Sequence, residues 1–207
     1  MRARMALVGA QQRVQLREIL LRDKPAHMVE VSPKATVPVM VLEDEQVLEE
    51  SLDIMLWALK RNDPENWLQP EQGSLDEMLA LITEIDGDFK HHLDHYKYAT
   101  RHVGDGEDPV AYAEKHRAAA LAILAQLESR LEANRYLFGN RIALADVAIA
   151  PFIRQFANTD ITWFNAQDLP KLQAWLQAFL ADDLFTGIMT KFPQWQTNDP
   201  QEIFPAA

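Results

Sequence analysis

The sequence predicts a chain in two parts, a mixed α/β N-terminal half and an all-helical C-terminal half. Up to about residue 60, short strand-like and helical segments alternate quickly, which is typical of mixed α/β structure. A polar, proline-bearing connection follows at residues 61–73. From residue 74 onward the clear apolar patterns have helical spacing. We therefore expect domains at 1–60 and 74–207, joined by a linker at 61–73.

The N-terminal half is expected to alternate between short helices and strands. In order, the expected segments are a short helix at the start, a strand-like run at 13–20, strands at 38–42 and 46–48, and a helix at 51–59. The acidic turn at 43–45 is short enough to join its two flanking strands as an antiparallel hairpin.

The C-terminal half is expected to form a helical bundle. Ser74 followed by Glu77 is a capping box, and the apolar pattern after it predicts one helix that runs through Phe89 toward Tyr96. Further helices are expected at about 109–134, at 144–156 and just after Pro170. The segment 144–156 is apolar nearly all round, which predicts a helix at the centre of the bundle, bent at Pro151.

Composition excludes several classes of function. A net charge of -11 argues against a nucleic-acid partner, because binding a polyanion requires a cationic face. No apolar stretch is long enough to cross a membrane, and the first residues lack the apolar core of a signal peptide, so a cytoplasmic location is expected. The 207 residues contain no cysteine, which excludes disulfides and thiol nucleophiles among them.

One motif in the N-terminal half combines a Val-Pro pair with an acidic pair that opens a helix. Val37-Pro38 lies within the run 32–40, and Glu49-Glu50-Ser51 follows at the mouth of the next helix. This spacing resembles the glutathione-binding half of cytosolic glutathione transferases. The resemblance implies an incomplete thioredoxin-like domain, the glutathione transferase fold, and glutathione as co-substrate. In that family the proline is cis and the residue before it offers its backbone to the cysteinyl part of glutathione, which assigns Val37 and Pro38.

Glu50 and Ser51 also suit glutathione on chemical grounds. The γ-glutamyl end of glutathione presents both an ammonium and a carboxylate. Glu50 can bind the ammonium, whereas Ser51 and the N–H groups of the helix that it opens can bind the carboxylate. On this dipeptide alone, a solvated turn residue and a simple helix cap are the commoner explanation. Together with the Val-Pro pair, the binding interpretation is favoured.

The segment 20–25 is similar to the omega class and its bacterial relatives. In these proteins a lysine before proline contacts the glycyl end of glutathione, which assigns Lys24, although a surface lysine explains the residue about equally well. Members of this class begin with a strand and a Cys-Pro-Tyr or Cys-Pro-Phe turn. The chain resembles them only from the following helix onward, so the first strand and the catalytic cysteine are expected upstream of Met1. No catalytic residue is therefore assigned within the 207 residues.

The resemblance continues through the helical half. Residues 140–146 resemble the helix-capping motif of the family, with Ala143 where Ser or Thr is usual, so Asp146 is expected to be structural and the cap half lost. The family builds its electrophile pocket partly from the first long helix and the C-terminal tail. Our candidates for this pocket share a face of that helix or reach in from the tail: Phe89, His92, Tyr96 and Trp195. Core packing explains Phe89 equally well.

A dense group of histidines lies in the same long helix. His91 and His95 are spaced i, i+4 and could chelate a metal ion, but the sequence offers no convincing third and fourth ligand. A solvated helix face is the favoured interpretation, so no metal is expected.

Two functional hypotheses follow. The first is a transferase that conjugates glutathione to a small electrophile or exchanges it with a small disulfide. The alternative is a non-catalytic module with the same fold, which uses its helical half for protein contacts in a stress response. Family analogy adds a homodimer. Retention on immobilised glutathione distinguishes the two hypotheses.

Overall fold

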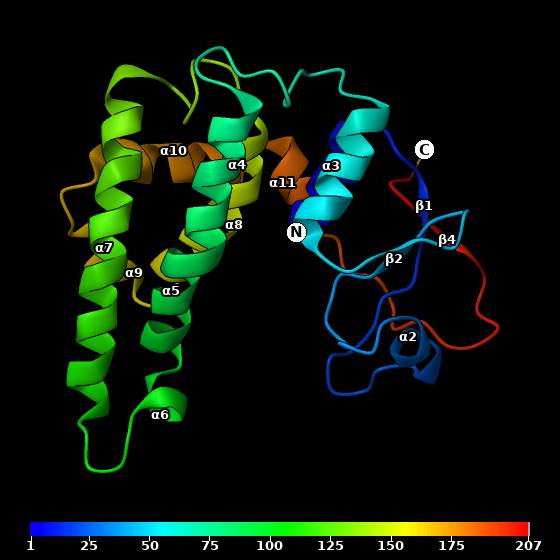
Figure 1. Cartoon of the computed structure of the whole chain (residues 1–207), viewed down its shortest axis with the longest axis horizontal. Coiled ribbons are helices and arrows are strands. Elements are labelled where there is room, and N and C mark those ends of the chain that lie inside the picture. The colour runs from blue at the N-terminus through cyan, green and yellow to red at the C-terminus, as the bar shows by residue number, and fades with distance from the viewer. Residues whose placement is uncertain (207) are drawn as a thin grey trace. The chain divides into compact units, whose positions relative to one another are not determined.

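A computed structural model describes residues 1–206, which fall into two compact units (Figure 1). The N-terminal unit consists of Met1–Glu65 and the C-terminal residues from Asp182 onward, whereas the helical unit is Asn66–Ala181. The sequence analysis grouped the residues after 181 with the helical half. They join the N-terminal unit instead, because they pack on its first helix and pair with its first strand. None of the helices described is both long and apolar enough to cross a bilayer.

Helices form the core of the N-terminal unit. Its helices are α1 (Arg2–Gly9), α2 (Ala26–Val31), α3 (Ser51–Arg61) and α11 (Asp183–Ile188). Both α3 and α11 pack against α1. Met5 and Ala6 of α1 and Met55 and Ala58 of α3 are fully buried. Small alanines at this contact let the two helices approach closely, while the flexible methionines fill the space that remains.

The strands of this unit form two separate antiparallel pairs. The expected hairpin is present as β2 (Met40–Val41) and β3 (Val47–Leu48), with Met40 opposite Leu48. The first of these strands is shorter than expected. Its predicted start included Pro38, which has no N–H to donate to a neighbouring strand.

The second strand pair joins residues from the two ends of the unit. β1 (Val14–Leu16) pairs with β4 (Glu202–Phe204), with Val14 opposite Phe204. β4 lies in the region that was expected to be all-helical. Its backbone satisfies the hydrogen-bonding edge of β1, and Phe204 is buried beside Phe192. This is a long-range pairing that local sequence patterns do not reveal.

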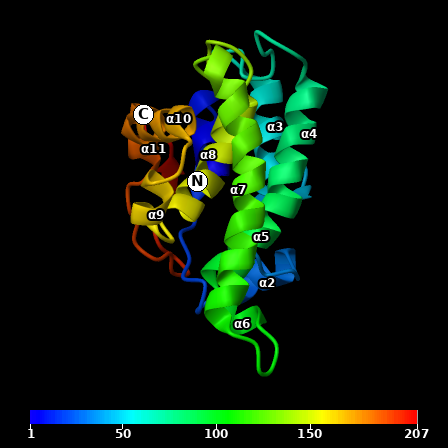
Figure 2. The ribbon, with the colours of Figure 1, turned by 90° about the vertical axis from the view of Figure 1, so that its left-hand side faces the viewer.

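The helical unit is a bundle, as the sequence predicts. It contains α4 (Leu75–Glu84), η1 (Ile85–Phe89), α5 (Lys90–Lys97), α6 (Ala99–His102), α7 (Pro109–Ala133), α8 (Leu144–Ala157), α9 (Ile161–Asn165) and α10 (Pro170–Ala181). The predicted helix from Ser74 toward Tyr96 is confirmed as the continuous run α4, η1 and α5, with a π-helical turn at η1. The long helix α7 runs alongside α5 (Figure 2).

Helix α8 forms the buried centre of this bundle. Residues 144–151 are all buried, and the helix continues through Pro151. Asp146 is fully buried in the first turn of α8 and accepts three hydrogen bonds of 3.0 Å, from the backbone N–H groups of Leu137 and Ala143 and from the indole of Trp175. The structural role expected of Asp146 is confirmed, and the aspartate half of the cap is intact.

Candidate functional site

The backbone at Val37 and Pro38 has the geometry expected from the motif. The peptide bond between them is cis. Val37 is 46% exposed. Within the described part of the chain, its backbone N–H and C=O form no hydrogen bond. A peptide-like ligand can therefore pair with this backbone segment as it would with a strand edge.

Two acidic side chains precede α3, and they differ in how firmly they are held. The buried Ser32 hydroxyl donates to Glu49 Oε1 at 2.6 Å. Glu50 is exposed, and its Oε1 accepts from the Lys34 ammonium at 3.2 Å. The hydrogen bond that Lys34 donates to Glu50 and the charge of Glu49 raise the pKa of Lys34. The acidic pair thus already binds one ammonium group, while the exposed Glu50 remains accessible to a second.

Helix α3 begins one residue earlier than it would if Ser51 were its cap. Glu50 is the N-cap and makes no side-chain cap hydrogen bond, so Ser51 is the first helical residue rather than the cap. The Ser51 hydroxyl accepts from Arg2 Nη1 at 3.4 Å. The first-turn N–H groups have no intrahelical acceptor, and they carry the positive end of the helix dipole. Arg2, largely buried, adds a cation beside this helix end.

The other two candidate residues of the N-terminal unit lie in its loops. Lys24 is exposed and precedes Pro25, which is the N-cap of α2. The backbone N–H of Trp195 donates to the carbonyl oxygen of Glu18 at 2.8 Å. The Arg17 guanidinium lies 4.8 Å from the centre of the Trp195 ring. These contacts fix the C-terminal tail to the strand β1 region of the same unit.

In the helical unit, Tyr96 lines a depression with a volume of ≈ 330 Å³. The depression is lined by Tyr96, Lys97, Ala99, Thr100, Pro109, Val110, Ala113, Glu114 and Arg117. Burial raises the pKa of Tyr96, against a hydrogen bond from Arg117 that lowers it. The Arg117 guanidinium also lies 4.4 Å from the centre of the Trp163 ring. A neutral phenol beside a fixed guanidinium can donate hydrogen bonds to a polar group of a small molecule.

The two other pocket candidates in the helical unit, Phe89 and His92, do not line this depression. Phe89 is fully buried, and its ring centre lies 5.6 Å from that of Phe156, so its side chain belongs to the core. His92 is half-buried, and its Nδ1 lies 2.9 Å from His116 Nδ1. Only Tyr96 of the four pocket candidates lines the depression.

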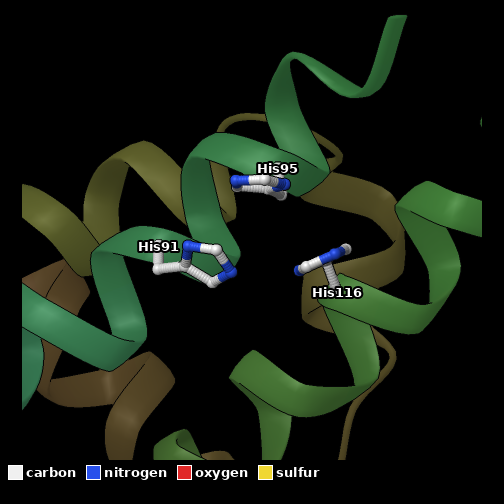
Figure 3. A group of neighbouring side chains, drawn as sticks. All are labelled: His91, His95 and His116. Carbon is white, nitrogen blue, oxygen red and sulfur yellow. The ribbon is translucent and has the colours of Figure 1, made fainter. Parts of the chain in front are cut away.

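The histidine group contains a member that the sequence analysis missed. His91 and His95 on α5 face His116 on α7, and one ring nitrogen from each lies within 4.8 Å of the others (Figure 3). Burial and the neighbouring imidazoles lower the pKa of His116 to about 4, and burial is also the largest cause that lowers the pKa of His95. The rings of His95 and His116 are therefore neutral at pH 7. His116 lies on a different helix, and only the packing of α5 on α7 reveals it.

Comparison of the sequence with family models identifies both halves of the chain. Residues 1–67 match the N-terminal domain of glutathione S-transferase, and residues 109–178 match its C-terminal domain. The first match covers the N-terminal unit up to Glu65 and the first two residues of the helical unit, and the second match lies within the helical unit. No curated protein matches the sequence significantly.

Solved structures share the fold at low sequence identity. A glutathione transferase from Methylococcus capsulatus is 23% identical, with a TM-score of 0.71 and coverage of 91% of each chain. A glutathione transferase homologue from Sulfitobacter, solved with bound glutathione, is 16% identical, with a TM-score of 0.72 over 90% of each chain. A mutant of poplar glutathione transferase F1 is 15% identical and has a TM-score of 0.75 over 91% of this chain and 90% of its own. The assignment to the omega class finds no support among these structures.

Proposed function

Because this chain belongs to the glutathione S-transferase family, we propose that it binds glutathione and transfers it to a small electrophile or a small disulfide. In conjugation, the glutathione sulfur forms a bond to the electrophilic carbon, a leaving group departs with its electron pair, and the thiol proton goes to solvent. In exchange, the same sulfur attacks a disulfide and releases one thiol. The nucleophilic sulfur is that of glutathione in both cases.

The observation that carries this proposal is the exposed, unpaired backbone at Val37, next to the cis peptide bond, in the unit that also carries Glu50 and the start of α3. A tripeptide needs a backbone partner for its central residue and charged partners for its ends. We assign Val37 to the cysteinyl backbone. We assign Glu50 to the γ-glutamyl ammonium and the first turn of α3, with Ser51, to the γ-glutamyl carboxylate.

Lys34 and Lys24 complete the proposed charge pattern. Lys34 is already bound to Glu50, so the ligand ammonium must share this carboxylate with it or displace it. Lys24 is assigned to the glycyl carboxylate. Its exposure on the loop before α2 leaves the ammonium accessible.

A calorimetric titration with reduced glutathione tests the binding site. The substitution Glu50→Ala removes a charge-assisted contact with the ligand ammonium, which contributes about 1.5–3 kcal/mol. The dissociation constant for glutathione should therefore be about 10- to 100-fold higher. Glu43→Ala is the matched control, because it removes the same charge from an exposed position in the hairpin turn of the same unit. Equal affinity of both variants and the unmodified protein would refute the assigned role of Glu50, and no binding at all would refute the site.

Turnover distinguishes the transferase from the non-catalytic module. An aryl chloride and a small aromatic disulfide serve as substrates, each followed by absorbance. Glutathione binding without turnover of either substrate would favour the module. In the transferase, Tyr96→Phe should lower turnover while glutathione affinity stays unchanged, because Tyr96 is not among the residues that we assign to glutathione. Tyr136→Phe, away from the depression, is its control. The homodimer and the cytoplasmic location stay predictions.

A further inference from the structure

Five of the six histidines of the chain come together in the helical unit. His91, His92 and His95 lie on α5, His102 lies on α6 and His116 lies on α7. Ring centres are 4.1 Å apart for His91 and His95, and 4.7 Å apart for His95 and His116. The rings contact one another across three helices, far in sequence from the glutathione-binding motif. The proposed function does not use this cluster.

Three of these rings have the arrangement of a metal-binding triad. His91 and His95 are one helical turn apart, so they share a face of α5, and α7 brings His116 opposite to them (Figure 3). Their nearest nitrogens lie within 4.8 Å of one another. Zinc–nitrogen bonds of about 2.0–2.1 Å in tetrahedral geometry need ligand nitrogens about 3.3–3.4 Å apart. Rotation about the broad imidazole torsions can close this difference without moving the helices.

Two rings of the triad, those of His95 and His116, contact a neighbouring side chain through their Nδ1 atoms. The Tyr112 hydroxyl lies in hydrogen-bond contact with His95 Nδ1, and His92 Nδ1 lies 2.9 Å from His116 Nδ1. Each contact leaves the Nε2 atom of the triad ring as its remaining ligand atom. A ligating histidine usually donates the N–H of its other ring nitrogen to a neighbouring acceptor, and this hydrogen bond orients the ring. The surroundings of the triad therefore match those of a built metal site.

The ligand chemistry selects the class of ion. Three imidazole ligands suit borderline divalent transition metals, of which zinc is the commonest in proteins. They suit Mg²⁺ and Ca²⁺ poorly, because those ions prefer oxygen ligands. His91 is exposed, so the fourth coordination position opens to solvent. A solvated helix face does not account for His116, because only 8% of it is exposed.

We propose that His91, His95 and His116 bind one divalent transition-metal ion, and that this ion links α5 to α7. Zinc is the probe that we use for this site. Because a ligand that binds only the folded chain raises its stability, zinc should raise the melting temperature with the logarithm of its concentration. This inference does not depend on glutathione binding.

Calorimetry with Zn²⁺ on tag-free protein, treated first with a chelator and dialysed, tests the proposal. We expect one ion per chain. His91→Gln removes an exposed ligand and leaves the fold intact, and its expected zinc affinity is at least about 100-fold lower, since loss of even an outer-sphere partner reduces affinity about 10–100-fold. His27→Gln, in the other unit, is the matched control and should bind like the unmodified protein.

A second measurement keeps the test independent of heat signals. Co²⁺ bound by three imidazoles and water should give the visible absorption of a low-coordinate site in the unmodified protein and in His27→Gln, but not in His91→Gln or His95→Gln. Circular dichroism verifies that each variant is folded. The proposal is overturned if zinc does not saturate at one ion per chain, if the triad variants bind like the unmodified protein, or if binding is lost only with His102→Gln.

Discussion

The buried carboxylate of Asp146 should make the stability of the helical unit depend on pH. Burial raises the pKa of Asp146 to about 6 from an ordinary value of 3.8, although three hydrogen bonds act in the opposite direction. A raised pKa in the folded state means that the stabilising contribution is fully present below the unfolded value. It is then lost as the pH rises through about 6. The full difference is about 3 kcal/mol, since one pKa unit corresponds to about 1.4 kcal/mol.

Asp146→Asn isolates this contribution, because asparagine keeps the shape but does not titrate. The free energy of unfolding of both proteins is measured in urea between about pH 5 and about pH 8. About half of the loss has already occurred at pH 5, so the unmodified protein should lose about 1–2 kcal/mol relative to Asp146→Asn across this range. Effects of other titrating groups cancel in the difference. A difference that is constant with pH, or that changes in the opposite direction, would refute the reasoning.

Three further substitutions, with Glu132→Ala as a control for the first, test the packing of the helical unit by urea unfolding. Glu128→Ala should cost about 2–3 kcal/mol, because the buried Glu128 carboxylate accepts from the two first-turn N–H groups of α10, at 3.0 and 2.7 Å. The exposed Glu132→Ala should cost less than about 0.5 kcal/mol. Phe89→Ala should cost about 3–5 kcal/mol, and a cost below 1 kcal/mol would contradict its place in the core. Ser74→Ala should cost about 1 kcal/mol, because its hydroxyl accepts from Glu77 N; no change would contradict the cap.

The sequence predicts most of the fold, because its strongest signals are local. The helix that starts at Ser74, the all-round burial of α8 and the hairpin at 40–48 each follow from spacing within one segment. The pairing of β1 with β4 could not be predicted in this way. It joins segments from opposite ends of the chain, and β4 is only three residues long.

In the candidate site, too, the sequence predicts local features, whereas contacts between distant residues could not be predicted. The cis bond at Pro38 and the start of a helix beside Glu50 agree with the motif, because both are properties of neighbouring residues. The ion pair of Lys34 with Glu50 depends on how a loop folds back, and the third histidine of the triad depends on helix packing. Phe89 shows the limit of helical periodicity, which places a residue on a face but does not say whether that face meets a ligand or the core.

Backbone amide NMR during a titration with reduced glutathione tests the central claim most directly. The account predicts saturable chemical-shift changes at the amides of Val37 and Ser51, with one common dissociation constant, while the amide of Leu137 in the other unit keeps its position. The account would be contradicted if the amide signals of Val37 and Ser51 did not move during the titration of the unmodified protein. It would also be contradicted if only signals of residues 66–181 moved.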